Sequence, residues 1–193
     1  MTVGGLILAA GEGRRFGGAK QLADVGGRPL LAHAVGAMLA VAAIDPVVVV
    51  LGARADEVRA GVDVGRASVV VADDWASGQS ASLRAGLRAL GDVDAAVVTL
   101  GDMPFVTPAV IAGVLHHDPR RFDAVRATYH GHPGHPVLLG RSLLERAGEL
   151  EGDVGFRDLL AGARVREFEC GDLCDPVDID TREELASIRP RSG

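Results

Sequence analysis

Apolar, β-branched runs alternate with segments of helical periodicity along the first half of the chain, and this alternation constrains the fold most strongly. Continuous apolar runs are typical of parallel strands that are covered on both faces. Strands are expected at residues 3–9, 47–51, 68–72 and 95–100, and helices at residues 29–43, 56–61 and 80–90. This rhythm predicts an α/β fold, a doubly wound, mostly parallel sheet with right-handed crossovers.

The second half of the chain is less regular, and no repeat or linker separates it from the first half. Helices are expected at residues 108–116, 141–147, 154–160 and 182–188, and strands at residues 124–129, 136–139 and 165–169. A histidine-rich insert between the first two of these strands predicts a hairpin. The length of 193 residues is that of one domain, so we expect residues 1–193 to form a single domain.

Composition and charge exclude several classes of protein. Hydrophobic residues make up 48% of the chain, which rules out a disordered chain. The apolar stretch at residues 30–44 is too short to cross a bilayer, and the first residues lack the basic segment of an export signal. A net charge of −6 argues against nucleic-acid binding, and two cysteines cannot form a disulfide framework. We expect a cytoplasmic monomer that binds neither nucleic acid nor a membrane.

A glycine-rich loop, residues 11–20, follows the first expected strand and ends in the only lysine of the chain, Lys20. The loop departs from the dinucleotide-binding fingerprint at Phe16, where a glycine is required. It departs from the Walker A motif at Gln21, where a hydroxyl residue would hold Mg²⁺. What remains is a loop whose glycines let backbone N–H groups approach phosphate oxygens, with positive charge from Arg15 and Lys20. We expect this loop to be exposed; an ordinary turn with a basic rim is the alternative.

Acidic residues follow another strand and recur near the end of the chain. Asp102 comes directly after the strand at residues 95–100, where a carboxylate is well placed for Mg²⁺. Asp178 and Asp180 precede Thr181, which begins a capping-box pattern for the last helix. Because ligands of open α/β sheets bind beyond the carboxyl ends of the strands, we expect Asp102 and one of the later aspartates to share a site. Turn residues and helix caps are the alternative interpretation of each acid.

Seven short motifs, in order along nearly the whole chain, resemble the nucleotidyltransferase superfamily that includes the molybdenum-cofactor nucleotidylyltransferases. The motifs are LAAGEGRRFGGAK at residues 8–20, GGRPLL at 26–31, GQSASL at 78–83, LGDMP at 100–104, GHPVL at 134–138, GDVG at 152–155 and DIDT at 178–181. Within this MobA/MocA-like family, the GDMP sequence is most similar to the molybdenum cofactor cytidylyltransferases. The resemblance implies a Rossmann-like nucleotidyltransferase fold.

The resemblance also implies a role for particular residues of this chain. The residues implied to bind the nucleotide are Leu8, Ala9, Ala10, Gly11, Gly13, Arg15, Lys20, Gly78, Gln79, Ser80 and Ser82. Those implied to act in catalysis are Lys20, Arg15 and Asp102, with Asp102 and Asp180 as ligands of Mg²⁺. Those implied to face the acceptor are His135, Pro136, Gly152 and Asp153.

The implied reaction transfers CMP from CTP to the phosphate of molybdopterin and releases pyrophosphate. A molybdoenzyme that receives the product is a further implied partner. Three alternatives stay open: another phosphorylated acceptor such as a sugar, alditol or lactate phosphate; GTP in place of CTP; and a non-catalytic chaperone that binds the nucleotide or the finished cofactor.

Two other features compete for a role. The histidines of the insert, His130, His132 and His135, are of a type that binds zinc, but Cys170 and Cys174 lack the spacing of common zinc ribbons. Trp75 follows the third strand and either packs in the core or stacks on a base.

Overall fold

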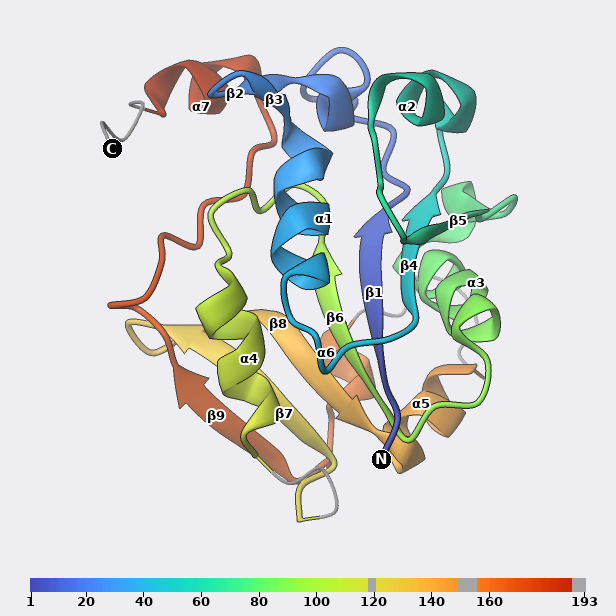
Figure 1. Cartoon of the computed structure of the whole chain (residues 1–193), viewed down its shortest axis with the longest axis vertical. Helices are drawn as coiled ribbons and strands as arrows, with labels where there is room; N and C mark the ends of the chain where they lie inside the picture. The colour runs from blue at the N-terminus through green and yellow to red at the C-terminus, as the bar shows by residue number, and fades with distance from the viewer. Residues whose placement is uncertain (118–120, 149–155, 189–193) are drawn as a thin grey trace.

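The computed structural model describes residues 1–117, 121–148 and 156–188, and within them one large sheet carries the fold (Figure 1). Its strands are β1 (Val3–Ala9), β4 (Val47–Leu51), β5 (Ser68–Val71), β6 (Ala95–Leu100), β7 (Ala124–Tyr129), β8 (His132–Gly140) and β9 (Val165–Glu169). The helices are α1 (Leu30–Leu39), α2 (Ala55–Gly61), α3 (Gln79–Leu90), α4 (Pro108–Leu115), α5 (Arg141–Gly148), α6 (Phe156–Leu159) and α7 (Arg182–Ser187).

The strand order of the sheet is β5-β4-β1-β6-β8-β7-β9. Strand β1 pairs in parallel with both β4 and β6, whereas β8 runs antiparallel to β6 and β7. The chain moves from β1 to β4 and β5 on one side and then crosses to β6 on the other. The expected doubly wound, mostly parallel α/β sheet is confirmed, and its order reverses between β1 and β6.

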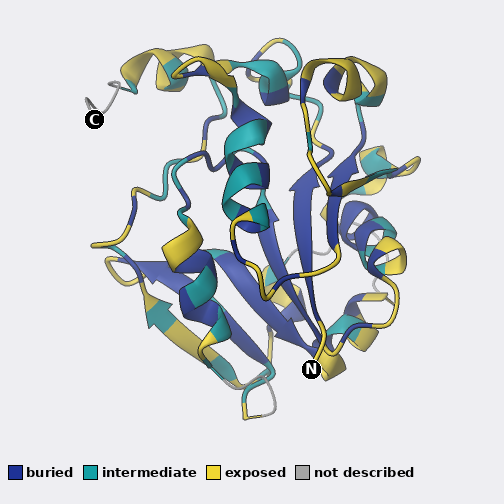
Figure 2. Ribbon diagram, viewed as in Figure 1, coloured by how far each residue is buried: buried dark blue, intermediate teal, exposed yellow. Residues whose placement is uncertain are grey.

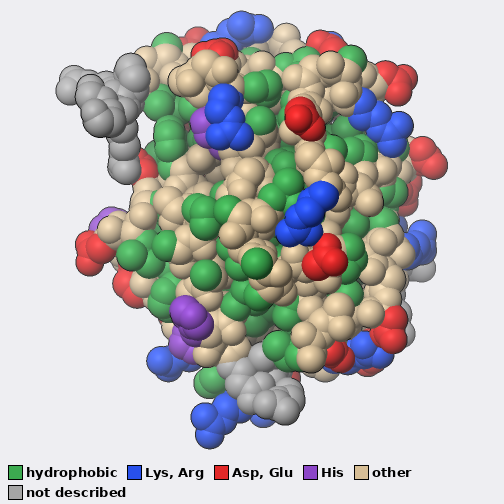
Figure 3. Space-filling model, in the orientation of Figure 1, with side chains coloured by type: hydrophobic (Ala, Val, Ile, Leu, Met, Phe, Trp, Pro, Cys, Tyr) green, Lys and Arg blue, Asp and Glu red, His purple; other side chains and the backbone are tan. Residues whose placement is uncertain are grey.

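Helices cover both faces of the sheet, which explains the unbroken apolar runs. In β4, Val49 packs into a cluster with Met38 of α1, while Val48 and Val50 pack into the cluster on the opposite face with Leu83 of α3. Every residue of β4 is therefore buried, as the dark strand interior in Figure 2 shows. On the face that carries α1 and α4, basic and acidic side chains are interspersed (Figure 3).

Three expected elements differ from the structure by more than one residue. The helix expected at residues 29–43 is α1, Leu30–Leu39. It begins after Pro29 because Pro29 pairs with Asp24 in a small hairpin of β2 (Asp24–Val25) and β3 (Arg28–Pro29), and it ends four residues earlier than expected. The strand expected at residues 136–139 is longer, because β8 already pairs with β7 at His132. The histidine-rich insert is thus mostly strand, with its turn at residues 130–131. Of the helix expected at residues 154–160, the structure describes α6, and its first two residues lie outside the described part.

The C-terminal segment returns across the carboxyl edge of the sheet, at the top of Figure 1. The Ile179 backbone N–H donates to the Asp102 carbonyl oxygen at 3.1 Å, and the Ile179 side chain packs with Phe16 and Leu30 in a small buried cluster. The Arg182 guanidinium lies 5.0 Å from the centre of the Phe16 ring. These contacts bring a segment from the end of the chain beside the glycine-rich loop. No helix in the described part of the chain is long and apolar enough to span a bilayer.

Candidate active site

The loops that follow β1 and β6 begin side by side at the point where the strand order reverses. Gly101, directly after β6, donates its N–H to the Leu8 carbonyl oxygen at 2.9 Å. A Cβ on Gly101 would lie 2.8 Å from the Cβ of Ala9, so the two strand ends meet too closely for any side chain there. In open α/β sheets, ligands bind in the crevice outside such a switch point.

The glycine-rich loop is closed on itself around Gly13. The Gly13 carbonyl oxygen accepts the N–H of Gly17 at 2.9 Å and the N–H of Gly18 at 3.4 Å. Gly13 has φ +67°, and a Cβ there would collide with the Gly18 carbonyl oxygen. Only glycine fits both the left-handed backbone and the close approach. The loop delivers Lys20 to the start of a short 3₁₀ helix, Lys20–Leu22.

The Lys20 ammonium lies between two carboxylates from distant parts of the chain. Its Nζ donates to Asp102 Oδ2 at 2.6 Å and to Asp180 Oδ1 at 2.8 Å. The two carboxylate oxygens are therefore no farther apart than the sum of these distances. Arg15 donates to the other oxygen of Asp180 at 2.7 Å from the solvent side. The Lys20 side chain is only 12% exposed, so the expectation of an exposed loop is wrong at this residue.

Electrostatics at this cluster follow from the contacts. Burial alone lowers the pKa of the Lys20 ammonium, but attraction and hydrogen bonds from Asp102 and Asp180 outweigh it and raise the pKa. Hydrogen bonding to Lys20 holds the pKa of Asp180 below its usual value. Partial burial and repulsion from Asp102 and Asp180 raise the pKa of Asp178 to about 6. Asp180, rather than Asp178, is the acid that contacts Lys20.

The two carboxylates have spare capacity for a cation. Asp102 Oδ1 is buried and has no hydrogen-bond partner in the described part of the chain. Two carboxylates, completed by phosphate oxygens and waters, are the ligand set that Mg²⁺ takes in nucleotide-binding sites. Residues 1–117, 121–148 and 156–188 hold no group of three or more His, Cys, Asp or Glu side chains suited to a metal ion. A cation here would thus need ligand oxygens from a bound phosphate or water.

A cleft of about 510 Å³ opens over this cluster. Nine of the residues implied to bind nucleotide line it: Leu8, Ala9, Ala10, Gly11, Gly13, Lys20, Gly78, Gln79 and Ser82. Arg15 does not line the cleft and reaches Asp180 instead. Ser80 is buried in α3 with its hydroxyl 3.4 Å from Arg84, so it lies away from the cleft surface.

The residues implied to face the acceptor are placed less completely. His135 and Pro136 lie on β8, beside β6 and outside the lining of the cleft. The His135 ring packs edge-on against Phe156 at 5.0 Å, and burial lowers the pKa of the imidazole, although hydrogen bonding and the charge of Asp102 oppose this. Gly152 and Asp153 lie outside the described residues.

Gln21 and Trp75 are among the residues that line the cleft without having been implied as site residues. Gln21 is 3% exposed and donates its side-chain amide to the carbonyl oxygens of Ala9 and Gly11. In the sequence, Gln21 was noted only because it lacks the hydroxyl that the Walker A motif requires. The signal available for its role was that a polar residue directly follows Lys20. Trp75 lines the cleft and packs so tightly on Gly52 that a Cβ there would lie 2.7 Å from the Trp75 Cβ.

An open α/β sheet with charged side chains at its switch point is typical of proteins that bind a ligand there. The profile of the MobA-like NTP transferase domain family matches residues 5–168, and the chain belongs to that family. It is an enzyme of the nucleotidyltransferase class, and proteins named as cytidylyltransferases are among its relatives.

Three similar proteins illustrate the breadth of the family. Nicotine blue oxidoreductase of Paenarthrobacter nicotinovorans is 33% identical over 95% of this chain and 94% of its own length. The 2-C-methyl-D-erythritol 4-phosphate cytidylyltransferase of Cereibacter sphaeroides is 35% identical over 60% of this chain and 53% of its own length. The structure of Rv0371c from Mycobacterium tuberculosis in complex with manganese superposes with a TM-score of 0.78 at 30% identity, over 97% of this chain and 100% of that one.

Proposed function

We propose that this enzyme transfers CMP from CTP to the phosphate of a molybdopterin-type acceptor and releases pyrophosphate, with Mg²⁺ as its cofactor. The observation that carries the proposal is the Lys20 ammonium held between Asp102 and Asp180 at the cleft. A phosphoryl-type transfer needs positioning and neutralisation of charge rather than a covalent intermediate on the protein. The cluster supplies cationic and anionic groups for that purpose in a largely buried place.

Each group has a role in this reaction. Lys20, Arg15 and the N–H groups of the glycine-rich loop hold the triphosphate. Asp102 and Asp180 would hold the metal, which would supply positive charge against the charge that builds up on the α-phosphate. An oxygen of the acceptor phosphate attacks the α-phosphorus in line. The bond from the α-phosphorus to the bridging oxygen breaks, and that oxygen leaves with pyrophosphate.

The choice of CTP follows from the polar side chains of the cleft and from one of the similar proteins. Gln79 and Ser82 offer an amide and a hydroxyl to a base edge, and polar groups of this kind discriminate strongly because mismatched partners stay unpaired. A cytidylyltransferase is among the similar proteins. The acceptor is assigned to the side of His135 and Pro136, with Gly152 and Asp153. We further propose that residues 1–193 act as a single cytoplasmic domain and as a monomer.

Release of pyrophosphate tests the proposal directly. The protein is incubated with Mg²⁺, each of the four NTPs and a panel of acceptors: molybdopterin, sugar phosphates, alditol phosphates and lactate phosphate. We expect pyrophosphate only with CTP and molybdopterin. A preference for GTP, or for another acceptor, would reassign the substrate. Nucleotide binding without pyrophosphate from any pair would favour the non-catalytic chaperone.

A second candidate is an oxidoreductase, because the similar protein that matches 95% of this chain carries that name. The glycine-rich loop argues against a dinucleotide, since Phe16 replaces the last glycine of the fingerprint. Following the absorbance of NADH and NADPH with quinone-type dyes, alongside the pyrophosphate assay, separates the two. Cofactor oxidation that survives Asp102→Asn would favour the oxidoreductase.

A further inference from the structure

The side chain of Gln21 donates hydrogen bonds to two backbone carbonyls at the turn between β1 and the glycine-rich loop. Its Nε2 donates to the Ala9 carbonyl oxygen at 2.8 Å and to the Gly11 carbonyl oxygen at 3.1 Å. With 3% of its surface exposed, the amide makes these bonds where water does not compete. The position of Gln21 is fixed in turn, because it belongs to the 3₁₀ helix that begins at Lys20.

These bonds set the direction of successive peptide groups. The Ala10 carbonyl oxygen accepts the Ala53 N–H at 3.3 Å, so the carbonyls of Ala9, Ala10 and Gly11 are all engaged. In a trans peptide the next N–H points opposite to the carbonyl. The N–H groups of Gly11 and Glu12 therefore point away from the partners of these carbonyls. Neither donates a hydrogen bond in the described part of the chain, and both residues line the cleft.

We infer that Gln21 is a positioning residue that turns the Glu12 N–H group outward, beside the Gly11 N–H group that the Ala10–Ala53 bond directs, as an anion site for the phosphates of the nucleotide. The inference rests on the proposed function, since it assumes that the cleft binds a triphosphate. Without the amide, the carbonyls of Ala9 and Gly11 lose buried donors, and the peptides are free to rotate. An apolar side chain of the same length fills the space but leaves the Glu12 N–H group without a fixed direction.

Gln21→Met removes both donors and keeps the side-chain length. We expect the affinity for Mg²⁺–CTP and for inorganic pyrophosphate, measured by calorimetry, to fall about tenfold or more. Because pyrophosphate has no base, equal losses for the two ligands place the effect at the phosphates. In ¹H–¹⁵N spectra, pyrophosphate should shift the Glu12 amide of the wild type strongly and that of the variant weakly.

Thr99→Val is the matched control, because Thr99 is a buried polar residue on β6 whose hydroxyl has no partner in the described chain. It should bind both ligands like the wild type. Gln21→Asn keeps a donor on a shorter side chain, serves if Gln21→Met does not fold, and should lose less affinity than Gln21→Met. Wild-type affinity in both Gln21 variants, or an equal loss in Thr99→Val, overturns the inference. Failure of the wild type to bind CTP or pyrophosphate instead overturns the proposed function.

Discussion

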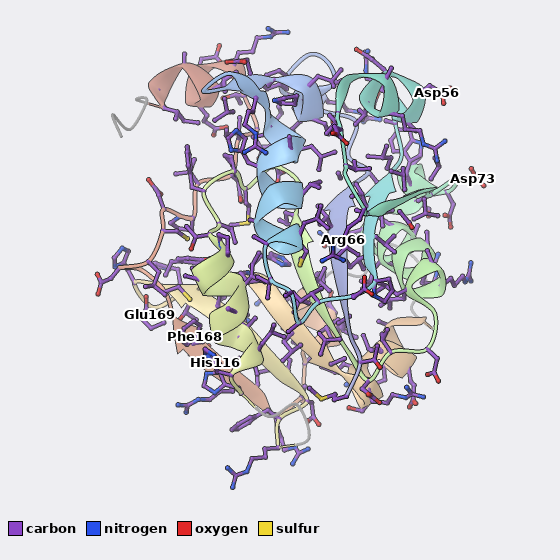
Figure 4. The ribbon with its side chains drawn as sticks, in the orientation of Figure 1. Asp56, Arg66, Asp73, His116, Phe168 and Glu169 are labelled. Carbon is purple, nitrogen blue, oxygen red and sulfur yellow. The ribbon has the colours of Figure 1, made fainter. Side chains whose placement is uncertain are left out.

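Two carboxylates, one at the centre and one at the edge of the sheet, are held in contrasting ways. Glu169, at the end of β9 (Figure 4), accepts the Thr128 hydroxyl and the backbone N–H groups of His130, Gly131 and Gly171, all within 3.1 Å. Asp102, at the end of β6, bonds Lys20 through one oxygen and leaves the other buried without a partner in the described chain. Both residues sit where a strand gives way to a loop.

The difference separates a structural carboxylate from one with capacity for a ligand. Every bond of Glu169 is made within the protein, and the result is a hairpin turn fixed against the segment that follows β9. Asp102 keeps one carboxylate oxygen without a hydrogen-bond partner in the described chain. This oxygen lies beside the Lys20 ammonium, which can attract a phosphate. Burying an unpartnered polar atom costs free energy, so its presence at a cleft points to a partner that arrives from outside. Four variants test this contrast.

Asp102→Asn should have the largest effect. The amide keeps the shape of the side chain but removes the charge that Lys20 and a divalent ion share, and we expect transfer to slow by roughly 10²–10³-fold. The thermal midpoint should change little, because Asp180 still pairs with Lys20. Pyrophosphate release and a thermal melt measure the two effects. Activity near that of the wild type would show that Asp102 holds no reacting group.

Gly13→Ala should come next. The substitution places a side chain at φ +67° and against the Gly18 carbonyl oxygen, so the glycine-rich loop has to open. We expect the affinity for CTP to fall by about tenfold or more. Gly18→Ala is the control, since a Cβ there meets nothing within 4 Å and its φ is not positive. Equal losses in both variants would mean that the loop's shape is not what binds the nucleotide.

Lys20→Met should have opposite effects on two ligands. Removing the ammonium frees the oxygens of Asp102 and Asp180, so Mn²⁺ should bind the nucleotide-free protein about tenfold more tightly, as seen by electron paramagnetic resonance. The affinity for CTP should fall, because a phosphate contact is lost. Arg15→Met, which removes a 73% exposed partner of Asp180 alone, should change Mn²⁺ binding less. Unchanged Mn²⁺ affinity in Lys20→Met would show that the Lys20 ammonium does not compete with a metal ion for the oxygens of Asp102 and Asp180.

Glu169→Gln makes the same chemical change as Asp102→Asn, and it should have the smallest effect on activity, less than about twofold. Bonds from the N–H groups of Gly171, Gly131 and His130 lower the pKa of Glu169 from 4.5 to about 2. A carboxyl with a lowered pKa stabilises the fold above its unfolded pKa, and the stabilisation is lost as pH falls through the folded pKa.

The wild type should therefore melt above Glu169→Gln at pH 7, and the gap should close between about pH 4.5 and 2. Thermal melts of both proteins across this range measure it. A gap that is constant with pH, or a large loss of activity, would contradict the structural role assigned to Glu169.

The parallel half of the sheet and the place of its site were predictable from local patterns. Apolar runs mark β1, β4 and β6, and the loops after them carry Lys20 and Asp102, because parallel strands end at one edge. The direction in which residues point around α3 explains why Ser80, which was implied to bind the nucleotide, does not line the cleft. Gln79 and Ser82 are three residues apart and share the face that lines the cleft, whereas Ser80 is turned into the core.

What sequence reasoning could not supply depends on contacts between distant segments. Lys20 pairs with Asp180, which lies 160 positions away, and the bond from the Ile179 N–H to the Asp102 carbonyl oxygen holds Asp180 beside it. The role of Gln21 depends on where two carbonyl groups point, and residue type alone does not fix that direction. The start of β8 at His132 depends on pairing with β7, while the histidines and proline there lack a strand-like pattern.

The docking of Ile179 on Asp102 also sets when the site can exist during synthesis of the chain. A nascent chain that has emerged from the ribosome only through β6 and α4 already holds Lys20 and Asp102, but it lacks the second carboxylate. The charged cluster is completed only when the segment around residue 179 has emerged and folded back across the sheet. A chain interrupted before that segment would contain the glycine-rich loop but not both aspartates. The charged cluster can therefore form only after residues 179 and 180 have been synthesised.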